Sequence, residues 1–165
     1  MDKKFGIGFY GGKYLPPHLG HGYCICTMSS VCEEGHIILF HGGDQELDCK
    51  ARGEWGKWAD VQSRLDHIKD FIEKYDYDNL YVHSIDVTDC KTPDGKEDWD
   101  METPLVRAIL PHIDAVFTGG PTHHDYFTRA YPEAYHYQVD PIRAAYPISS
   151  TMIRHDMRGL RHWMI

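Results

Sequence analysis

The stretch FGIGFYGGKYLPPHLGHGY, residues 5–23, contains the transition that decides the fold. The apolar run FGIGFY predicts a strand, and the glycines and prolines that follow predict a turn before a helix. Gly11 and Gly12 allow close approach of the backbone to a ligand, and free amides at the start of the helix favour an anion. His18 and His21 lie at that helix start, with Lys13 just before them. A phosphate site accounts for all of these features.

Other interpretations of this turn remain open from the residues alone. Two histidines three positions apart can arise by chance in a chain with 12 histidines, and a metal site would need a third ligand. The glycine spacing matches neither the dinucleotide pattern GxGxxG nor the P-loop pattern GxxxxGK[ST]. The turn is therefore not one of these two common phosphate cradles.

The rest of the chain alternates between short apolar runs and helical patterns. The expected strands are FGIGFY, HIILFH, NLYVHSI, AVFTGG and AYHYQV. The expected helices cover residues 20–34, 58–75, 101–110 and 123–131, with a further one starting near Ser150. This alternation predicts a single α/β domain over residues 1–165, with an open parallel sheet of five strands and helices on both faces. Residues 89–104, rich in charges and turn formers, are expected to form a loop.

Composition and charge narrow the functional classes. The formal net charge of −8 argues against a nucleic-acid partner, and no apolar run approaches the ~20 residues that cross a bilayer. The start of the chain lacks the apolar stretch of a signal peptide, so we expect a cytoplasmic protein without a membrane partner. Five cysteines without paired spacing indicate reduced thiols. Structural zinc is disfavoured because Cys24 and Cys26, two positions apart, would face different sides of a helix.

A second stretch, PISSTMIR at residues 147–154, supports an anion site. It places Ser149, Ser150 and Thr151 at an expected helix start, where hydroxyls commonly act as caps. Arg154 is less ordinary, because a cation close to a helix N-terminus opposes the helix dipole. A bound anion at that end would remove this conflict.

Both stretches resemble motifs of one superfamily. GKYLPPHLGH, residues 12–21, resembles the HxGH motif of the adenylyl- and cytidylyltransferases, and ISSTMIR, residues 148–154, resembles their ISSTxIR motif. Within the superfamily, the chain is most similar to nicotinamide-mononucleotide adenylyltransferases, both the archaeal type and the adenylyltransferase domain of the bifunctional bacterial nicotinamide-riboside kinase proteins. VFTGGP and VDPIRAAYPISSTMIR extend the similarity over most of the chain. The resemblance implies a Rossmann-like nucleotidyltransferase fold of the adenine nucleotide α-hydrolase-like type.

The resemblance also implies roles for individual residues. Catalytic roles around the reacting phosphates fall to His18, His21, Lys13 and Arg154. The implied ATP-binding residues are Tyr10, Gly11, Gly12, Lys13, His18, His21, Gly119, Gly120, Ser150, Thr151 and Arg154. The implied acceptor-binding residues are Arg64, Asp86 and Trp99. For Arg64 the alternative is a solvated charge on a helix, and for Trp99 it is a loop anchor on the core.

The activity that the resemblance implies is adenylyl transfer from ATP to nicotinamide mononucleotide, which gives NAD and pyrophosphate. Mg²⁺ would bind mainly to phosphate oxygens and water, with no protein metal ligand assigned. The expected partners are these two small molecules, and a homo-oligomer stays open. Two alternatives remain: transfer to another phosphorylated acceptor, such as phosphopantetheine or a polyol or sugar phosphate, and a non-catalytic nucleotide-binding module.

Overall fold

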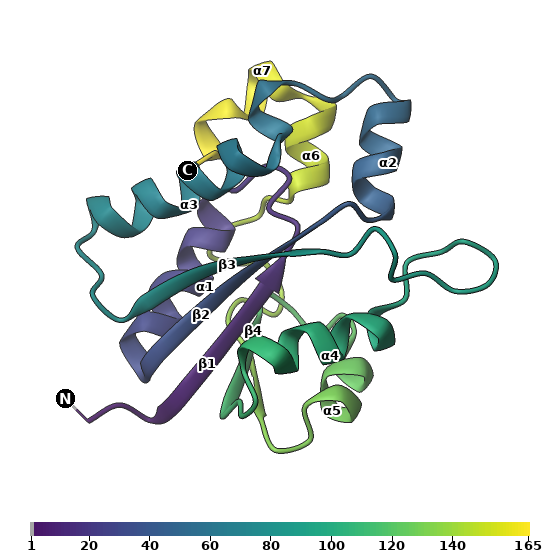
Figure 1. The fold of residues 1–165 in the computed structure, drawn as a ribbon. Coiled ribbons are helices and arrows are strands. Elements are labelled where there is room, and N and C mark those ends of the chain that lie inside the picture. The colour runs from purple at the N-terminus through teal and green to yellow at the C-terminus, as the bar shows by residue number, and fades with distance from the viewer. Residues whose placement is uncertain (1) are drawn as a thin grey trace.

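Five parallel strands form one sheet in the computed structural model, which describes residues 2–165 (Figure 1). The strands are β1 (Phe5–Gly12), β2 (Cys32–His41), β3 (Leu80–Asp86), β4 (Ala115–Thr118) and β5 (Tyr135–Gln138). Their order is β3-β2-β1-β4-β5, so the order reverses between β1 and β4. The predicted open parallel α/β sheet is confirmed. In sheets of this kind, ligands bind at the carboxyl ends of the strands beside the reversal.

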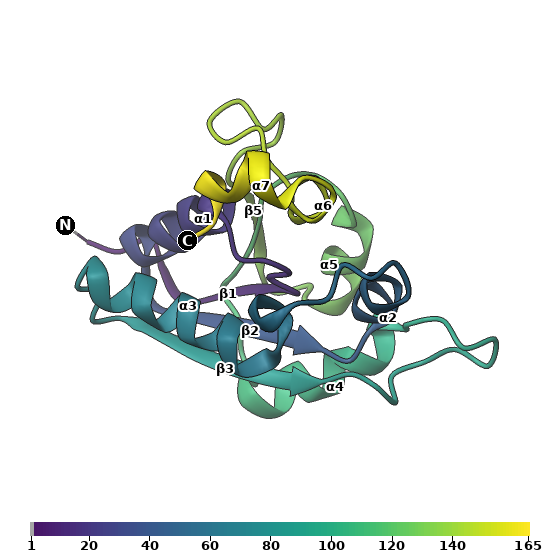
Figure 2. The same ribbon diagram turned by 90° about the horizontal axis from the view of Figure 1, so that it is seen from above.

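Helices cover both faces of the sheet, as Figures 1 and 2 show together. The helices are α1 (Leu19–Val31), α2 (Asp44–Ala51), α3 (Val61–Lys74), α4 (Trp99–Ile109), α5 (His124–Ala130), α6 (Ser150–His155) and α7 (Met157–Leu160). Short 3-10 turns span Lys57–Ala59 and Arg161–Trp163. Helices α1 and α3 cover one face, and α4 and α5 cover the other.

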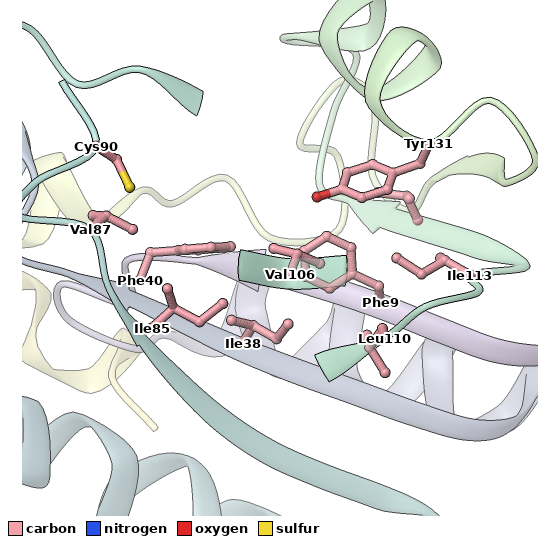
Figure 3. Close-up of a cluster of buried hydrophobic side chains, with 11 residues drawn as sticks. Phe9, Ile38, Phe40, Ile85, Val87, Cys90, Val106, Leu110, Ile113 and Tyr131 are labelled. Carbon is pink, nitrogen blue, oxygen red and sulfur yellow. The ribbon is translucent and has the colours of Figure 1, made fainter. Parts of the chain in front are cut away.

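Neighbouring residues of β1 supply the two cores because side chains alternate along a strand. Phe9 packs with Ile38 and Phe40 of β2 and with Val106 of α4 (Figure 3). Tyr10 faces the opposite side, in the cluster that includes Ile25 and Met28 of α1 and Ile68 of α3. The amphipathic pattern expected for the segment around Ile68 therefore corresponds to a buried helix face.

Close packing of α1 on β1 depends on a glycine. A Cβ at Gly8 would lie 2.6 Å from the sulfur of Cys32 and 3.0 Å from Cγ of Met28. Any larger residue at position 8 would push α1 away from the sheet. Because α1 carries the two motif histidines at its start, this packing fixes their position relative to β1.

Several predicted helix and loop boundaries are wrong, because strand pairing and helix capping set the ends of these elements. The first helix ends at Val31 rather than 34, because Cys32 pairs with Phe5 and begins β2. Helix α2 was not predicted. Residues 89–104 are not all loop, because the Asp98 carboxylate accepts the Asp100 amide and α4 begins at Trp99. The predicted 58–75 helix is divided by Asp60, which caps α3.

Of the five cysteines, Cys24, Cys32, Cys49 and Cys90 are buried and Cys26 is exposed. Cys24 and Cys26 thus face different sides of α1, as predicted. Burial raises the pKa of Cys24 to about 11 and that of Cys32 to about 12. These thiols pack as small apolar side chains. Within residues 2–165, no helix has both the length and the apolar character required to span a membrane.

Candidate functional site

A cavity of about 480 Å³ lies at the carboxyl ends of β1 and β4, where the strand order reverses. Its volume falls within the usual range for small-molecule sites. The lining comes from the turn after β1, the start of α1, the loop after β4, the start of α4 and the segment between β5 and α6. These are the regions that carry both sequence motifs.

The two motif histidines cap helix α1 together. His18 is the N-cap, and its Nδ1 accepts the backbone N–H of Gly20 at 3.0 Å. Nδ1 of His21 in turn accepts the backbone N–H of His18 at 3.1 Å. The rings stack with their centroids 3.7 Å apart. Since both Nδ1 atoms are acceptors, the neutral rings carry their protons on Nε2 and can donate them to a ligand.

Both rings are neutral at physiological pH. Burial, followed by the positive charge of Arg143, lowers the pKa of His18 to about 4. Burial, His18 and Arg143 together hold the pKa of His21 well below its usual value. The two residues line the cavity as hydrogen-bond donors that carry no net charge.

Arg143 is the cation that faces this pair, and the sequence assigned it no role. It lines the cavity and is exposed, with a φ of 51°. The turn that carries it is held by Asp140, whose carboxylate accepts the backbone N–H groups of Ala144, Ala145 and Tyr146. Arg143 was detectable as the lone cation between β5 and the second motif.

The second motif contributes hydroxyls to the cavity. Ser149 caps α6 by accepting the amide of Met152, Ser150 donates to the Pro16 carbonyl at 2.8 Å, and Thr151 follows. All three serine and threonine residues line the cavity. The contact from Ser150 ties the two motifs together, although 134 residues separate its partners.

Arg154 lies behind the cavity lining. Its Nη1 donates to the Leu15 carbonyl at 2.6 Å, its Nη2 donates to Thr151 Oγ1 at 3.2 Å, and its Nε lies 3.4 Å from a Glu54 carboxylate oxygen. Arg154 does not oppose the helix dipole as predicted, because α6 has only six residues and Arg154 is in its last turn. A cation there is favourable without an anion.

The glycines at the end of β1 and in the loop after β4 line the cavity for different reasons. A Cβ on Gly119 would meet no atom within 4 Å, and one on Gly120 would lie 3.5 Å from the Pro141 carbonyl oxygen. A Cβ on Gly11 would instead lie 2.6 Å from the ring of Phe40. Gly119 thus leaves an open surface, whereas Gly11 is required by packing.

Two further predicted ATP-binding residues also line the cavity. Gly12 lies against the ring of Tyr14. Tyr10 is buried, and burial raises the pKa of its hydroxyl well above the usual value. Its side chain contributes mainly to the core under the turn.

At the far end of the cavity, Glu97 joins Lys13 to Trp99. Lys13 Nζ lies 2.8 Å from both Glu97 carboxylate oxygens, and the Trp99 indole N–H donates to Glu97 at 2.7 Å. The Asp44 amide also donates to Glu97, at 3.2 Å. Trp99 is half-buried, lines the cavity and has His123 at a ring distance of 4.4 Å. The indole is therefore held by its hydrogen bond to Glu97 and still lines the cavity, where a ligand could contact it.

Two predicted acceptor residues do not line the cavity. Arg64 is completely buried, where it pairs with Glu46 and donates to the Lys13 carbonyl at 2.8 Å. The alternative of a solvated charge is therefore wrong. Asp86 is exposed at the end of β3, where its carboxylate accepts the amide and hydroxyl of Thr88. These hydrogen bonds lower the pKa of Asp86.

The carboxylates at the cavity do not form a dedicated metal centre. Glu102 and Asp140 line it, but the oxygens of Asp140 already accept backbone N–H groups. Within residues 2–165, no three His, Cys, Asp or Glu side chains are grouped to hold a metal ion. A divalent cation here would depend mainly on oxygens of a bound ligand and on water.

No protein-family model matches the chain. Solved structures do match: a NadR protein in complex with NAD and AMP-PNP superposes with a TM-score of 0.65 and 16% identity over 99% of this chain. The chain has the nucleotidyltransferase fold. A Francisella tularensis bifunctional NMN adenylyltransferase/ADP ribose pyrophosphatase, complexed with AMP and a manganese ion, shares that fold with a TM-score of 0.58 and 14% identity over 93% of the chain.

A third match with the nucleotidyltransferase fold is a candidate nicotinate-nucleotide adenylyltransferase from Vibrio parahaemolyticus. Its TM-score is 0.54, with 19% identity over 93% of this chain and 88% of that protein. The chain spans less than half of the other two proteins, 46% of NadR and 42% of the Francisella enzyme.

Glu97 and Glu102, at the same end of the cavity as Trp99, were not predicted from the sequence as site residues. Glu102 lines it directly and is only 5% exposed. No spacing rule links either residue to Lys13, which lies 84 positions before Glu97. Only the fold brings these groups together.

Proposed function

We propose that the protein transfers the adenylyl group of MgATP to nicotinamide mononucleotide, forming NAD and pyrophosphate. The observation that carries the proposal is the neutral pair His18 and His21, whose Nδ1 atoms are occupied by backbone amides while Nε2 is left to donate. A single cavity joins this pair to the indole of Trp99. Donors for a triphosphate and a platform for a ring thus occur in one site.

ATP occupies the end of the cavity formed by both motifs. The adenosine lies against Gly119 and Gly120, where the surface is open. The triphosphate extends across the start of α1, whose amides favour an anion. Thr151 offers a hydroxyl donor, Ser150 holds the second motif against Pro16, and Arg143 supplies positive charge.

The reaction needs little acid–base chemistry. An oxygen of the mononucleotide phosphate attacks the α-phosphorus of ATP, the bond from that phosphorus to the bridging oxygen breaks, and pyrophosphate leaves. A phosphate monoester has its second pKa near ~6, so the attacking oxygen is already ionised at neutral pH. His18 and His21 donate hydrogen bonds to oxygens that gain charge in the transition state. Catalysis then rests on positioning and charge stabilisation.

Mg²⁺ bound to the phosphate oxygens of ATP would neutralise part of their charge. The residues of this chain orient the two substrates. Arg154 acts in the proposal as a positioning residue, because it holds the Leu15 carbonyl and Thr151 behind the phosphates. Lys13, paired with Glu97, lies at the ring end of the cavity.

The acceptor lies at the opposite end, with its ring on Trp99. A pyridinium ring over an indole face gains ~0.5 to 2 kcal/mol, depending on desolvation. Arg64 and Asp86 have no direct contact in this proposal, since neither lines the cavity. Buried Arg64 supports the backbone of Lys13 from below.

An acceptor panel tests the proposal. The protein is incubated with MgATP and, separately, with nicotinamide mononucleotide, phosphopantetheine and a polyol phosphate, and pyrophosphate and dinucleotide are quantified. We expect turnover with the mononucleotide and a loss of ~10²-fold for His21→Asn. Turnover with only another acceptor would mean that the protein is an adenylyltransferase for that substrate and not for nicotinamide mononucleotide. ATP binding without turnover of any acceptor would overturn the proposal.

A further inference from the structure

Two carboxyl groups lie together at the ring end of the cavity, and the proposed reaction uses neither. Glu102 is in the first turn of α4, lines the cavity and is only 5% exposed. Its Oε1 is buried and receives no N–H or O–H hydrogen bond from any group within residues 2–165. A buried carboxyl oxygen without a donor needs a separate explanation.

The explanation is a proton shared with Glu97. Glu97 accepts hydrogen bonds from Lys13 and Trp99 and from the Asp44 amide, and these partners stabilise its ionised form. Burial acts against ionisation, but the contacts with Lys13 hold the pKa of Glu97 below its usual value. For Glu102, burial raises the pKa to about 8, and the hydrogen bond to Glu97 contributes. At pH 7 the proton therefore resides on Glu102.

This arrangement leaves a particular surface for a ligand ring. Lys13 and Glu97 cancel in charge, and neutral Glu102 directs its proton toward Glu97. Glu97 does not line the cavity, and its oxygens already accept from Lys13, Trp99 and the Asp44 amide. The acceptor left for a ligand is therefore the second carboxyl oxygen of Glu102, which suits the N–H groups of a carboxamide. A ring carboxylate has no donor to offer, and its oxygens would face that oxygen of Glu102.

We propose that Glu102 is the specificity-determining residue of the acceptor subsite, which selects a cationic ring bearing a carboxamide over the same ring bearing a carboxylate. The inference rests on the proposed function and adds the residue that distinguishes its acceptor from the carboxylate analogue. It concerns Glu102 itself, in contact with the ring substituent. Lys13 and Glu97 act as positioning residues for it.

The pair also gives the selection a pH dependence. Loss of the Glu102 proton above pH 8 adds a negative charge beside the ring. The cationic carboxamide ligand then binds more tightly, and the carboxylate ligand binds more weakly. The titratable and charged groups around Glu102, on its own helix and on the elements packed against it, are Lys13, Asp44, Cys90, Glu97, Asp98 and Tyr126. His123, beside Trp99, is a further titratable group at this end.

The test compares the binding of nicotinamide mononucleotide and nicotinic acid mononucleotide by calorimetry at pH 7 and pH 9, using the full chain. The phosphate and ribose are common to the two ligands, so their contributions cancel in the ratio of dissociation constants. For the wild type we expect a ratio of at least ~10 in favour of the carboxamide at pH 7, and a larger ratio at pH 9.

Two substitutions separate hydrogen bonding from charge. Glu102→Gln keeps a donor to Glu97 and an oxygen acceptor, so its ratio should match the wild type at pH 7 and stay constant to pH 9. Glu102→Met removes both, and its ratio should fall ~10-fold at pH 7. Thermal unfolding verifies that each variant is folded. If Glu102→Met does not fold, the comparison of the wild type with Glu102→Gln at the two pH values tests the proposal.

The outcomes distinguish the two proposals. Equal ratios for the wild type and both variants at both pH values would overturn the role of Glu102, even if the enzyme forms NAD. Preference for the carboxylate ligand in the wild type would also overturn it. A wild-type protein that binds the carboxamide ligand more tightly than the carboxylate ligand, but forms dinucleotide with neither, would contradict the proposed function. The proposed role of Glu102 in selectivity would still hold.

Discussion

The two ends of the cavity are built in different ways. At the phosphate end, His18 and His21 are held by backbone amides within the same helical turn. At the ring end, Lys13, Glu97 and Asp44 come from three separate segments, and their contacts join residues 53 and 84 positions apart. The first end is local in sequence, whereas the second exists only after the sheet has formed.

This difference has a functional consequence. A donor pair fixed by local capping is preorganised wherever α1 forms, which suits the chemistry common to all phosphate acceptors. A cluster assembled from distant segments can change with little effect on that chemistry. Substitutions at the phosphate end should therefore alter turnover, and those at the ring end should alter the choice of acceptor.

The largest effect is expected for a substitution that distinguishes the roles of the two ring nitrogens of His21. His21→Asn places an oxygen near the position of Nδ1, which retains the cap on the His18 amide but removes the Nε2 donor. We expect turnover to fall ~10²-fold or more with little change in melting temperature. His21→Gln, which places a donor near Nε2, should lose less. Steady-state kinetics with near-normal turnover for His21→Asn would remove this residue from the mechanism.

The low pKa of His18 predicts acid sensitivity at the phosphate end. Its pKa is about 4 in the folded protein and about 6.5 when unfolded, so the unfolded state binds more protons between these values. The stabilisation is complete above pH 6.5 and is lost as the pH falls toward 4. From pH 7 to pH 5 we expect this residue to lower the free energy of unfolding by about 2 kcal/mol.

Urea unfolding across this pH range measures the effect. His18→Asn, which retains an N-cap side chain without a titrating ring, should show a smaller decrease. The same pH dependence in both proteins would assign the sensitivity to other groups.

At the ring end, Trp99→Ala should raise the Michaelis constant for nicotinamide mononucleotide by ~3- to 30-fold and leave that for ATP nearly unchanged. The control is Trp55→Ala, because Trp55 packs in a separate small cluster and does not itself line the cavity, so stability should fall without a selective rise in either Michaelis constant. Equal weakening of both substrates by Trp99→Ala would make the indole a structural anchor instead.

The smallest expected effect distinguishes two glycines of the lining. Gly119→Ala adds a methyl group in open space, so stability should change by less than about 0.5 kcal/mol while the Michaelis constant for ATP rises a few-fold. Gly11→Ala would press on the rings of Phe40 and Phe9 and should destabilise the protein by ~1 to 3 kcal/mol. Thermal unfolding and ATP kinetics of both variants test this contrast, and the reverse order would contradict it.

The sequence predicts the fold and the phosphate end because both depend on local patterns. The strand, the turn and the HxGH spacing are adjacent in the chain, and capping follows directly from them. The ring end was only partly predictable. Trp99 stood out by its type, but its partner Glu97 and the protonated Glu102 depend on burial, which no spacing reveals.

Arg64 was predicted to bind the acceptor, but it does not line the cavity. Its position in a charged helix permitted a solvated or substrate-binding residue, yet the fold buries it against Glu46. Arg154 was misjudged because the length of α6 was not predictable from its hydroxyl-rich start. For Arg64 the missing information was its tertiary partner, and for Arg154 it was the length of the helix.

Isotope transfer tests the central claim most directly. The protein is incubated with Mg²⁺, nicotinamide mononucleotide and ATP labelled with ³²P at either the α or the γ position, and the products are separated. We predict that the α label appears in NAD and the γ label in pyrophosphate, with both signals reduced ~10²-fold in His21→Asn. An α label that remains in ATP or AMP, with none in a dinucleotide, would contradict adenylyl transfer at this site.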